Sequence, residues 1–234
     1  TSIYVMNADG SDIQQLTRGS GDVSPRWSPD GERIAFSQAG NLAVMNADGS
    51  GVKIVMPGQS PETAPLCESA PIVGGWSPDN KHVTYYEGIP GTTGSSGATP
   101  RPDRYNVCAV DVETGEVQVL VSEPAGKLHA EPHWSPDGKK IAFRDDRDSN
   151  CFPGSGSCDY EVYVLDLETG EETNVTNNPA LDIEPVWSPD GEWIMFASNR
   201  EDVNFDLYVI HPDGTGLQRV LDDPEAKDSY PSWR

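Results

Sequence analysis

The sequence lacks any run of about 18 apolar residues, so a membrane-spanning helix is not expected. Its first residues also lack the basic and apolar blocks of a signal peptide. Basic residues are scarce: Lys and Arg number 16 against 38 Asp and Glu, giving a net charge of −22. The longest basic cluster is the pair Lys139-Lys140. Because phosphate binding needs clustered Lys and Arg, we expect no nucleic-acid partner. The lack of a long apolar run leads us to expect no membrane insertion.

The motifs of several enzyme classes are also missing. The chain has no Gly-x-Ser-x-Gly, no P-loop, no Gly-x-Gly-x-x-Gly and no His-Glu-x-x-His. It has only four histidines, so a ring of histidine metal ligands is not expected. We therefore predict a protein that is not an enzyme. Its acidic surface suits solubility, a basic protein partner, or a hard cation such as Ca²⁺.

Cysteine is scarce too, with four residues and no metal-type spacing. Cys151 and Cys158 bracket a short Gly-rich stretch, which predicts that they pair and leaves Cys67 and Cys108 for each other. Four cysteines allow three connectivities, and free buried thiols are the alternative. Disulfides favour an oxidising compartment, so we expect a periplasmic or extracellular protein.

What the chain does have is a repeat. Trp-Ser-Pro-Asp-Gly, with Asn for Gly in the second copy, recurs at intervals of about 50 residues, and a fifth copy begins at the last Trp. The anchoring tryptophans are Trp27, Trp76, Trp134, Trp187 and Trp233. A period of this length is typical of propellers and arrays. We expect one domain over residues 1–234, with each Trp as a packing element between neighbouring sheets.

The same order of short strands and turns follows each Trp. In the first copy we expect strands at 33–37, 42–45 and 52–56, with a hairpin turn at 46–49. Four strands per copy predict an all-β propeller of four-stranded antiparallel blades. The chain supplies five blades, or six within a longer parent, and its N-terminal strands and C-terminal strand would close the ring. Loops at 88–103 and 144–160 are expected insertions.

The pattern of Trp-Ser-Pro-Asp-Gly, x-x-Ile-Ala-Phe and Tyr-Val-Met-Asn-Ala-Asp-Gly-Ser resembles the TolB-type β-propeller repeat. It is also similar to the propellers of prolyl oligopeptidase-type peptidases, and the resemblance covers essentially the whole chain. The α/β domain that precedes the propeller in TolB is absent from this sequence. The resemblance implies a noncatalytic, monomeric scaffold that binds a protein or peptide, such as an envelope protein. The alternatives are the noncatalytic propeller of a peptidase or a metal-dependent polysaccharide lyase.

Acidic residues recur five and three positions before the anchoring Trp. If these strands meet at a common axis, the acids would repel one another unless a cation neutralises them. Ca²⁺, with its flexible shell of six to eight oxygen ligands, is the expected ion. The predicted metal-site residues are Asp22, Glu131, Asp182, Glu184 and Asp228, with His129 as a neighbour. The alternative is that these acids bond to neighbouring turns or line a wet channel.

Overall fold

The computed structural model describes residues 1–19, 21–58, 71–90, 102–122, 129–147, 159–201, 204–221, 231 and 233. Every regular element in them is a β-strand. The chain divides into two compact units, Thr1–Pro102 with Asn106–Val121, and Asp103–Tyr105 with Ser122–Arg234. Within the described part of the chain, no helix has the length and apolar character needed to span a membrane.

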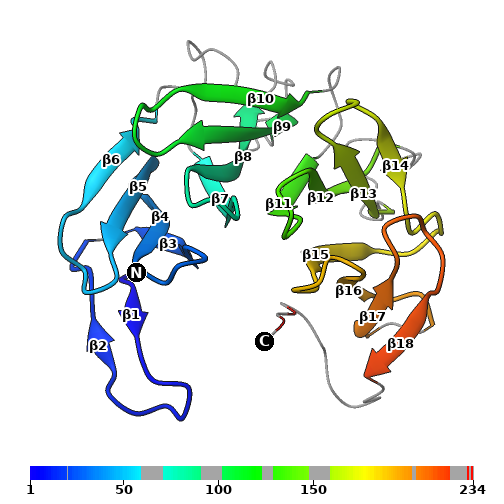
Figure 1. Cartoon of the computed structure of the whole chain (residues 1–234), viewed down its shortest axis with the longest axis horizontal. Helices are drawn as coiled ribbons and strands as arrows, with labels where there is room; N and C mark the ends of the chain where they lie inside the picture. The colour runs from blue at the N-terminus through cyan, green and yellow to red at the C-terminus, as the bar shows by residue number, and fades with distance from the viewer. Residues whose placement is uncertain are drawn as a thin grey trace, which may run out of the picture. The chain divides into compact units, whose positions relative to one another are not determined.

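The first unit holds a two-stranded ribbon and two four-stranded sheets (Figure 1). The ribbon is β1 (Tyr4–Val5) and β2 (Gln14–Gln15). The first sheet is β3 (Asp22–Trp27), β4 (Arg33–Gln38), β5 (Asn41–Asn46) and β6 (Lys53–Met56). The second sheet is β7 (Pro71–Trp76), β8 (His82–Pro90), β9 (Pro102–Asp111) and β10 (Val117–Val121). The strands of the ribbon and of the first sheet pair antiparallel, as do β7 with β8 and β9 with β10, and each sheet keeps the order of the chain.

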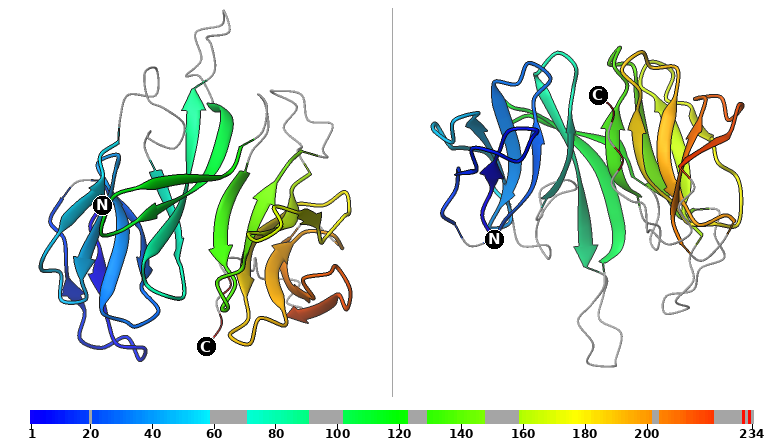
Figure 2. Two further views of the ribbon diagram at one scale, coloured as in Figure 1. Left: turned by 45° about the horizontal axis from the view of Figure 1, so that its top comes forward. Right: turned by 90° about the horizontal axis from the view of Figure 1, so that it is seen from below.

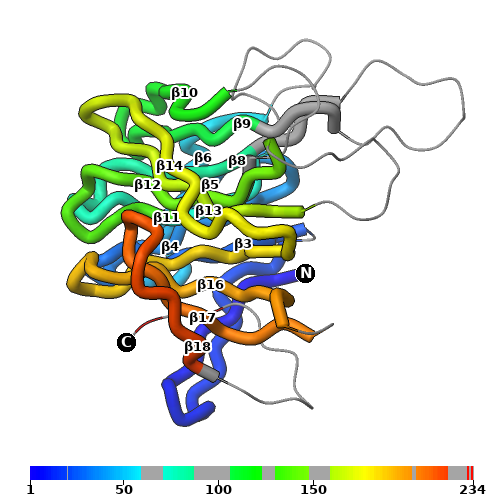
Figure 3. The backbone as a smooth tube through the Cα atoms, turned by 90° about the vertical axis from the view of Figure 1, so that its right-hand side faces the viewer, coloured from blue at the N-terminus to red at the C-terminus, as the bar shows by residue number. Residues whose placement is uncertain are grey.

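The second unit holds two further sheets of the same design. The third sheet is β11 (His129–Trp134), β12 (Lys140–Asp145), β13 (Glu161–Asp166) and β14 (Glu172–Asn174). The fourth sheet is β15 (Asp182–Trp187), β16 (Ile194–Ser198), β17 (Asp206–Ile210) and β18 (Gln218–Leu221). Figure 3 shows β16, β17 and β18 following one another across the fourth sheet. The predicted four-stranded antiparallel unit per repeat is therefore confirmed, and each first strand ends at the Trp of its copy.

The Ser-Pro-Asp-Gly motif is a hydrogen-bonded turn between the first and second strands of each sheet. In the fourth copy the buried Ser188 hydroxyl donates to Asp190 at 2.5 Å and accepts from the backbone N–H of Trp193 at 2.9 Å. The same Ser-to-Asp bond recurs in the other three copies at 2.6 Å. It lowers the pKa of the Asp carboxyl in every copy. Asn80, which replaces Gly in the second copy, takes the left-handed φ of 61° that the turn requires.

Both faces of the first sheet are apolar, because alternate residues of a strand point to opposite faces. Ala35 and Leu42 join the cluster shared with the second sheet. Phe36 and Ala43 join the opposite cluster with Ile3, which comes from the chain beside β1. Figure 2 shows this ribbon beside the first sheet. Each face of the first sheet is therefore covered by a neighbouring element.

The second unit has its own core between the third and fourth sheets. Val164 and Val175 of the third sheet and its border pack with Phe196 and Tyr208 of the fourth, and Trp187 completes the contact. Within this unit β15 packs against β11, β12 and β13. The core thus fixes the first strand of one sheet against the inner strands of the sheet before it.

The structure differs from the sequence-based expectations in two boundaries and in the burial of one Trp. Part of the expected loop at 88–103 is strand, because β8 continues to Pro90 and β9 begins at Pro102. The expected insertion at 144–160 begins inside β12, which extends to Asp145. Trp27 is 50% exposed, unlike the buried Trp76 and Trp187, so a Trp in this motif is not buried by the motif alone. Its neighbouring sheet decides its burial.

Candidate functional site

A β-bulge interrupts the first strand of each sheet a few residues before the Trp. The pairing register shifts between Val23 and Arg26 in β3 and at the corresponding places in β11 and β15, and between Val73 and Gly75 in β7. The residue three before the Trp has a positive φ in three of these strands: Ser24 at 54°, Glu131 at 57° and Glu184 at 58°. A non-glycine residue in this region is strained by about 1–3 kcal/mol and is held by its surroundings. The bulge re-aims the side chains at the predicted acidic positions.

The repeated Trp ties each first strand to the sheet before it. The indole N–H of Trp76 donates to the carbonyl of Arg26 at 3.0 Å, and that of Trp187 donates to the carbonyl of His133 at 3.1 Å. Trp233 makes the same bond to Val186 at 3.3 Å. In each case the acceptor is the residue just before the preceding Trp. Trp134 ends β11 and is half-buried.

Two of the predicted acids, Glu131 and Glu184, lie together in the second unit. The Glu131 carboxylate accepts the backbone N–H of Glu184 at 2.8 Å and forms an ion pair with Arg144 at 3.3 Å. The acid at this position therefore holds the neighbouring bulge.

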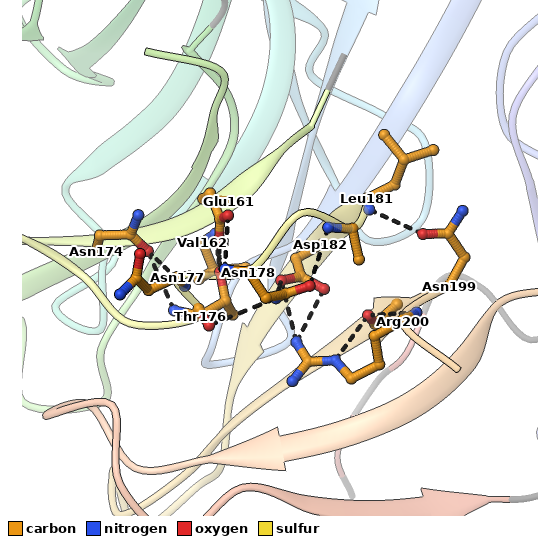
Figure 4. A network of polar contacts seen from close by, with 12 residues as sticks. Glu161, Val162, Asn174, Thr176, Asn177, Asn178, Leu181, Asp182, Asn199 and Arg200 are labelled. Atoms are coloured by element: carbon orange, nitrogen blue, oxygen red, sulfur yellow. Dashed lines mark hydrogen bonds and ion pairs between the residues drawn. The ribbon is translucent and has the colours of Figure 1, made fainter. Parts of the chain in front are cut away.

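Asp182, five residues before its Trp, lies at the centre of a buried polar network (Figure 4). Its carboxylate is fully buried and receives two 3.0 Å bonds from one nitrogen of the Arg200 guanidinium. The amide of Asn178 donates to it at 2.5 Å. Its own N–H donates to the carbonyl of Tyr160 at 2.7 Å, which joins the fourth sheet to the third. A buried carboxylate is tolerable only when it is paired and hydrogen-bonded in this way.

A second carboxyl, Glu161, lies in the same network at the start of β13 and was not predicted from the sequence. It accepts the Thr176 hydroxyl at 2.5 Å and the backbone N–H of Asn178 at 2.9 Å. Burial raises the pKa of Glu161 from 4.5 to about 7, and the nearby Asp182 charge acts in the same direction. The two bonds and Arg200 oppose this shift without cancelling it. Glu161 is thus a group that titrates near neutral pH inside the fold.

Arg200 belongs to a pattern that the sequence contains but that we did not predict. It lies 13 residues after Trp187 (200 − 187), and Arg147 lies 13 residues after Trp134 (147 − 134). Each guanidinium lies over a tyrosine of its own sheet, Arg200 at 4.8 Å from Tyr208 and Arg147 at 4.6 Å from the Tyr163 ring centroid. Each also pairs with a fully buried aspartate. The spacing to the Trp is the signal that identifies these arginines.

Asp22 holds the same sequence position as Asp182 but has different surroundings. It begins β3, pairs with Gln38 and is only 2% exposed. Neither of its carboxylate oxygens has a hydrogen-bond partner among the described residues. Position 13 after Trp27 (40 − 27) is Gly40, so the arginine of the other two sheets is missing. A buried, unpaired carboxylate is costly and calls for an explanation.

The remaining predicted residues are only partly described. The backbone of His129 begins β11, but its side chain lies outside the described part, as does Asp228. Among the described residues, no three His, Cys, Asp or Glu side chains are grouped to hold a metal ion. Cys108 is fully buried in β9, whereas Cys67, Cys151 and Cys158 lie outside the described residues. Both disulfides therefore stay predictions.

An open hollow of about 750 Å³ lies on the surface of the second unit. Lys140, Glu192, His211 and Asp213 line it, so it carries charges of both signs. His211 is held by a stacked contact with Trp193, whose ring centroid is 3.7 Å away.

Four antiparallel four-stranded sheets, each anchored by a Trp at the end of its first strand, define a protein of the β-propeller class. A family model described as the TolB β-propeller domain matches residues 37–234. The chain belongs to this family.

The chain is also similar to several individual proteins. An uncharacterized protein of Agrobacterium fabrum is 25% identical over 90% of this chain and 60% of its own length. Dipeptidyl-peptidase 5 of Porphyromonas endodontalis is 28% identical over 86% of this chain and 33% of its own length. The crystal structure of TolB from Acinetobacter baumannii has a TM-score of 0.69 at 17% identity, covering 97% of this chain and 50% of that one. The chain thus spans from a third to three fifths of the curated relatives described here.

Proposed function

We propose that this chain is a noncatalytic β-propeller that binds a protein or peptide through its acidic surface. The proposal is based on where the acidic residues lie: some bond within the fold and others are exposed. Glu131 and Asp182, which the sequence offered as site residues, hold neighbouring strands together. Other acids, such as Asp9, Asp30 and Asp48, are exposed, and in a chain with a net charge of −22 such a surface attracts a basic partner.

A peptide-display selection on the immobilised chain tests this proposal. We expect enrichment of Lys- and Arg-containing sequences whose binding weakens as salt is raised, because surface charges are screened. The purified chain is also incubated with the selected peptides and with polyuronides. Enrichment without cleavage supports the proposal. Cleavage of either substrate, or selection of peptides without basic residues, contradicts it.

The relation to dipeptidyl-peptidase 5 favours one second candidate, the noncatalytic propeller of a peptidase. This chain matches a third of that enzyme. The candidate requires a hydrolase domain with a Gly-x-Ser-x-Gly motif elsewhere in the parent polypeptide. Reading the coding sequence on either side of this segment separates the two candidates at once.

The calcium site is part of the proposal as a site to be tested. Two of its predicted ligands, Asp182 and Glu131, are bonded to Arg200 and to backbone in the structure. If Ca²⁺ binds at these acids, a chelator lowers the melting temperature of a Ca²⁺-loaded sample by several degrees, because a ligand that binds the folded state stabilises it. Equal melting temperatures with and without chelator reject the site.

A periplasmic or extracellular location is the last part of the proposal, and it depends on the cysteines. In that location the two predicted disulfides, Cys151–Cys158 and Cys67–Cys108, would form. A thiol assay on the denatured, unreduced protein from its native compartment is expected to find no free thiol. Detection of reactive thiols there contradicts both the pairing and the location.

A further inference from the structure

Asp22 and Asp182 have the same place in the repeat, as their backbone contacts show. Each begins the first strand of its sheet five residues before the Trp. The N–H of Asp182 donates to the Tyr160 carbonyl, and the N–H of Asp22 donates to the Thr1 carbonyl. A threonine a few residues before each aspartate also accepts a backbone N–H through its hydroxyl: Thr17 before Asp22 and Thr176 before Asp182. The two carboxylates are therefore set on the same local frame.

The partners that surround the two carboxylates differ in a specific way. Asp182 receives a guanidinium from Arg200 and an amide from Asn178. Glycines stand at both corresponding places near Asp22: Gly40 for the arginine and Gly19, two residues after the threonine, for the asparagine. The backbone at Gly19 lies so close to Asp22 that an added Cβ would be 2.7 Å from its Oδ2. The first sheet thus keeps the buried acid and lacks both groups that satisfy it.

The turn beside Asp22 is also shorter. Two residues, Ala39 and Gly40, join β4 to β5 with positive φ values of 48° and 85°. In the fourth sheet the segment between β16 and β17 covers residues 199–205 and carries Arg200. The first sheet therefore lacks both the arginine and the longer segment that, in the fourth sheet, brings Arg200 to the carboxylate.

We propose that Asp22 is a receptor for the guanidinium group of an arginine in a basic partner, at the place that Arg200 fills beside Asp182. The proposal rests on the proposed binding function and specifies its partner chemistry. A guanidinium presents its N–H donors in a planar fork that matches one carboxylate. A hard cation such as Ca²⁺ needs six to eight oxygen ligands, and no cluster of three acids forms among the described residues.

N-acetyl-argininamide is the probe, and the isosteric uncharged citrulline compound is its matched control. Binding to the isotopically labelled 234-residue chain is followed by NMR at the backbone amides of Gly19, Asp22 and Gln38. The test variant is Asp22→Asn. The Glu32→Gln variant, at an exposed position in the turn between β3 and β4, makes the same change in net charge. We expect the arginine probe to bind the unmodified chain and Glu32→Gln equally, to bind Asp22→Asn at least tenfold more weakly, and the citrulline compound not to bind.

Three outcomes overturn the proposal. In the first, the probe binds Asp22→Asn as well as it binds the unmodified chain. In the second, Ca²⁺ shifts the same amides in an Asp22-dependent way while the arginine probe does not. In the third, the probe binds the Arg18→Ala variant and not the unmodified chain, which would mean that the guanidinium of the exposed Arg18 already pairs with Asp22.

The carboxyl-carbon resonance of Asp22 in the unmodified chain gives a second readout that needs no variant. It is expected to shift on addition of the arginine probe, and an unchanged resonance at saturation overturns the proposal. Failure here is distinguishable from failure of the proposed function. If the peptide selection still enriches basic sequences, the chain binds such partners elsewhere, and only the role of Asp22 is lost.

Discussion

Glu161 makes the stability of this protein depend on pH in the physiological range. Its pKa in the folded chain is about 7, against 4.5 for an ordinary glutamate. Between these values the unfolded chain has lost this proton while the folded chain retains it. Folding stability therefore decreases as pH rises from about 4.5 to about 7, and is constant with respect to this group outside that window. The difference, at about 1.4 kcal/mol per pH unit, gives about 3 kcal/mol as an upper bound.

The Glu161→Gln variant removes the titration while keeping the contacts. The carbonyl of the new glutamine side chain accepts the Asn178 N–H, as Glu161 does. Its NH₂ group donates to the Thr176 hydroxyl, so this bond is kept with its direction reversed. We expect this variant to match the unmodified protein near pH 4.5 and to exceed its stability by up to about 3 kcal/mol above pH 7.

Urea unfolding at intervals from pH 4.5 to pH 8 measures this difference. The exposed Glu171→Gln variant, on the loop before β14, is the control for the loss of one negative charge. Its curve is expected to run parallel to that of the unmodified protein. If the Glu161→Gln curve is also parallel over this range, Glu161 does not titrate near pH 7 and the reasoning from burial is wrong.

The other predictions concern the repeated contacts. Arg200→Ala should destabilise the protein by roughly 3–5 kcal/mol, because it leaves the buried Asp182 unpaired. A shift in the urea midpoint no larger than the shift caused by replacing a surface arginine with alanine would contradict this. Trp187→Phe loses the indole hydrogen bond to the preceding sheet and should lower the free energy of unfolding by about 1 kcal/mol, plus any effect of changed packing. Trp27→Phe, at the half-exposed copy, should lower it by less in the same unfolding assay. Ser188→Ala removes the hydroxyl that organises the turn, and should lower the free energy of unfolding by about 1–2 kcal/mol.

Much of the fold follows from local patterns that are visible in the sequence. The Ser-Pro-Asp-Gly turn is built from atoms within a few residues of one another, as the Ser188–Asp190 bond shows. Strand alternation is equally local, so the four-stranded unit was predictable. Strand ends were less so: β8 reaches Pro90 because pairing with its neighbours, and not its composition, decides where a strand stops.

The candidate site was only partly predictable. Repetition marked Asp22 and Asp182 as related positions, but it could not tell that one is paired and the other is not. That difference depends on Arg200 and Gly40, which lie 18 residues further along the chain in each case (200 − 182 and 40 − 22). Glu161 gave no signal, because its raised pKa comes from burial in the assembled sheets.

The sequence by itself determined the repeat, its turns and the number of strands in each sheet, because these depend on the periodicity and conformational preferences of neighbouring residues. Only the tertiary structure decided which acids are neutralised and which Trp is buried. The Asp182 carboxylate is neutralised by Arg200, which a later segment of the same sheet brings to it, whereas Asp22 has no such arginine. Trp187 is enclosed and Trp27 is half exposed although they share one motif. Desolvation and charge pairing are properties of the packed surroundings, and a local sequence pattern does not contain them.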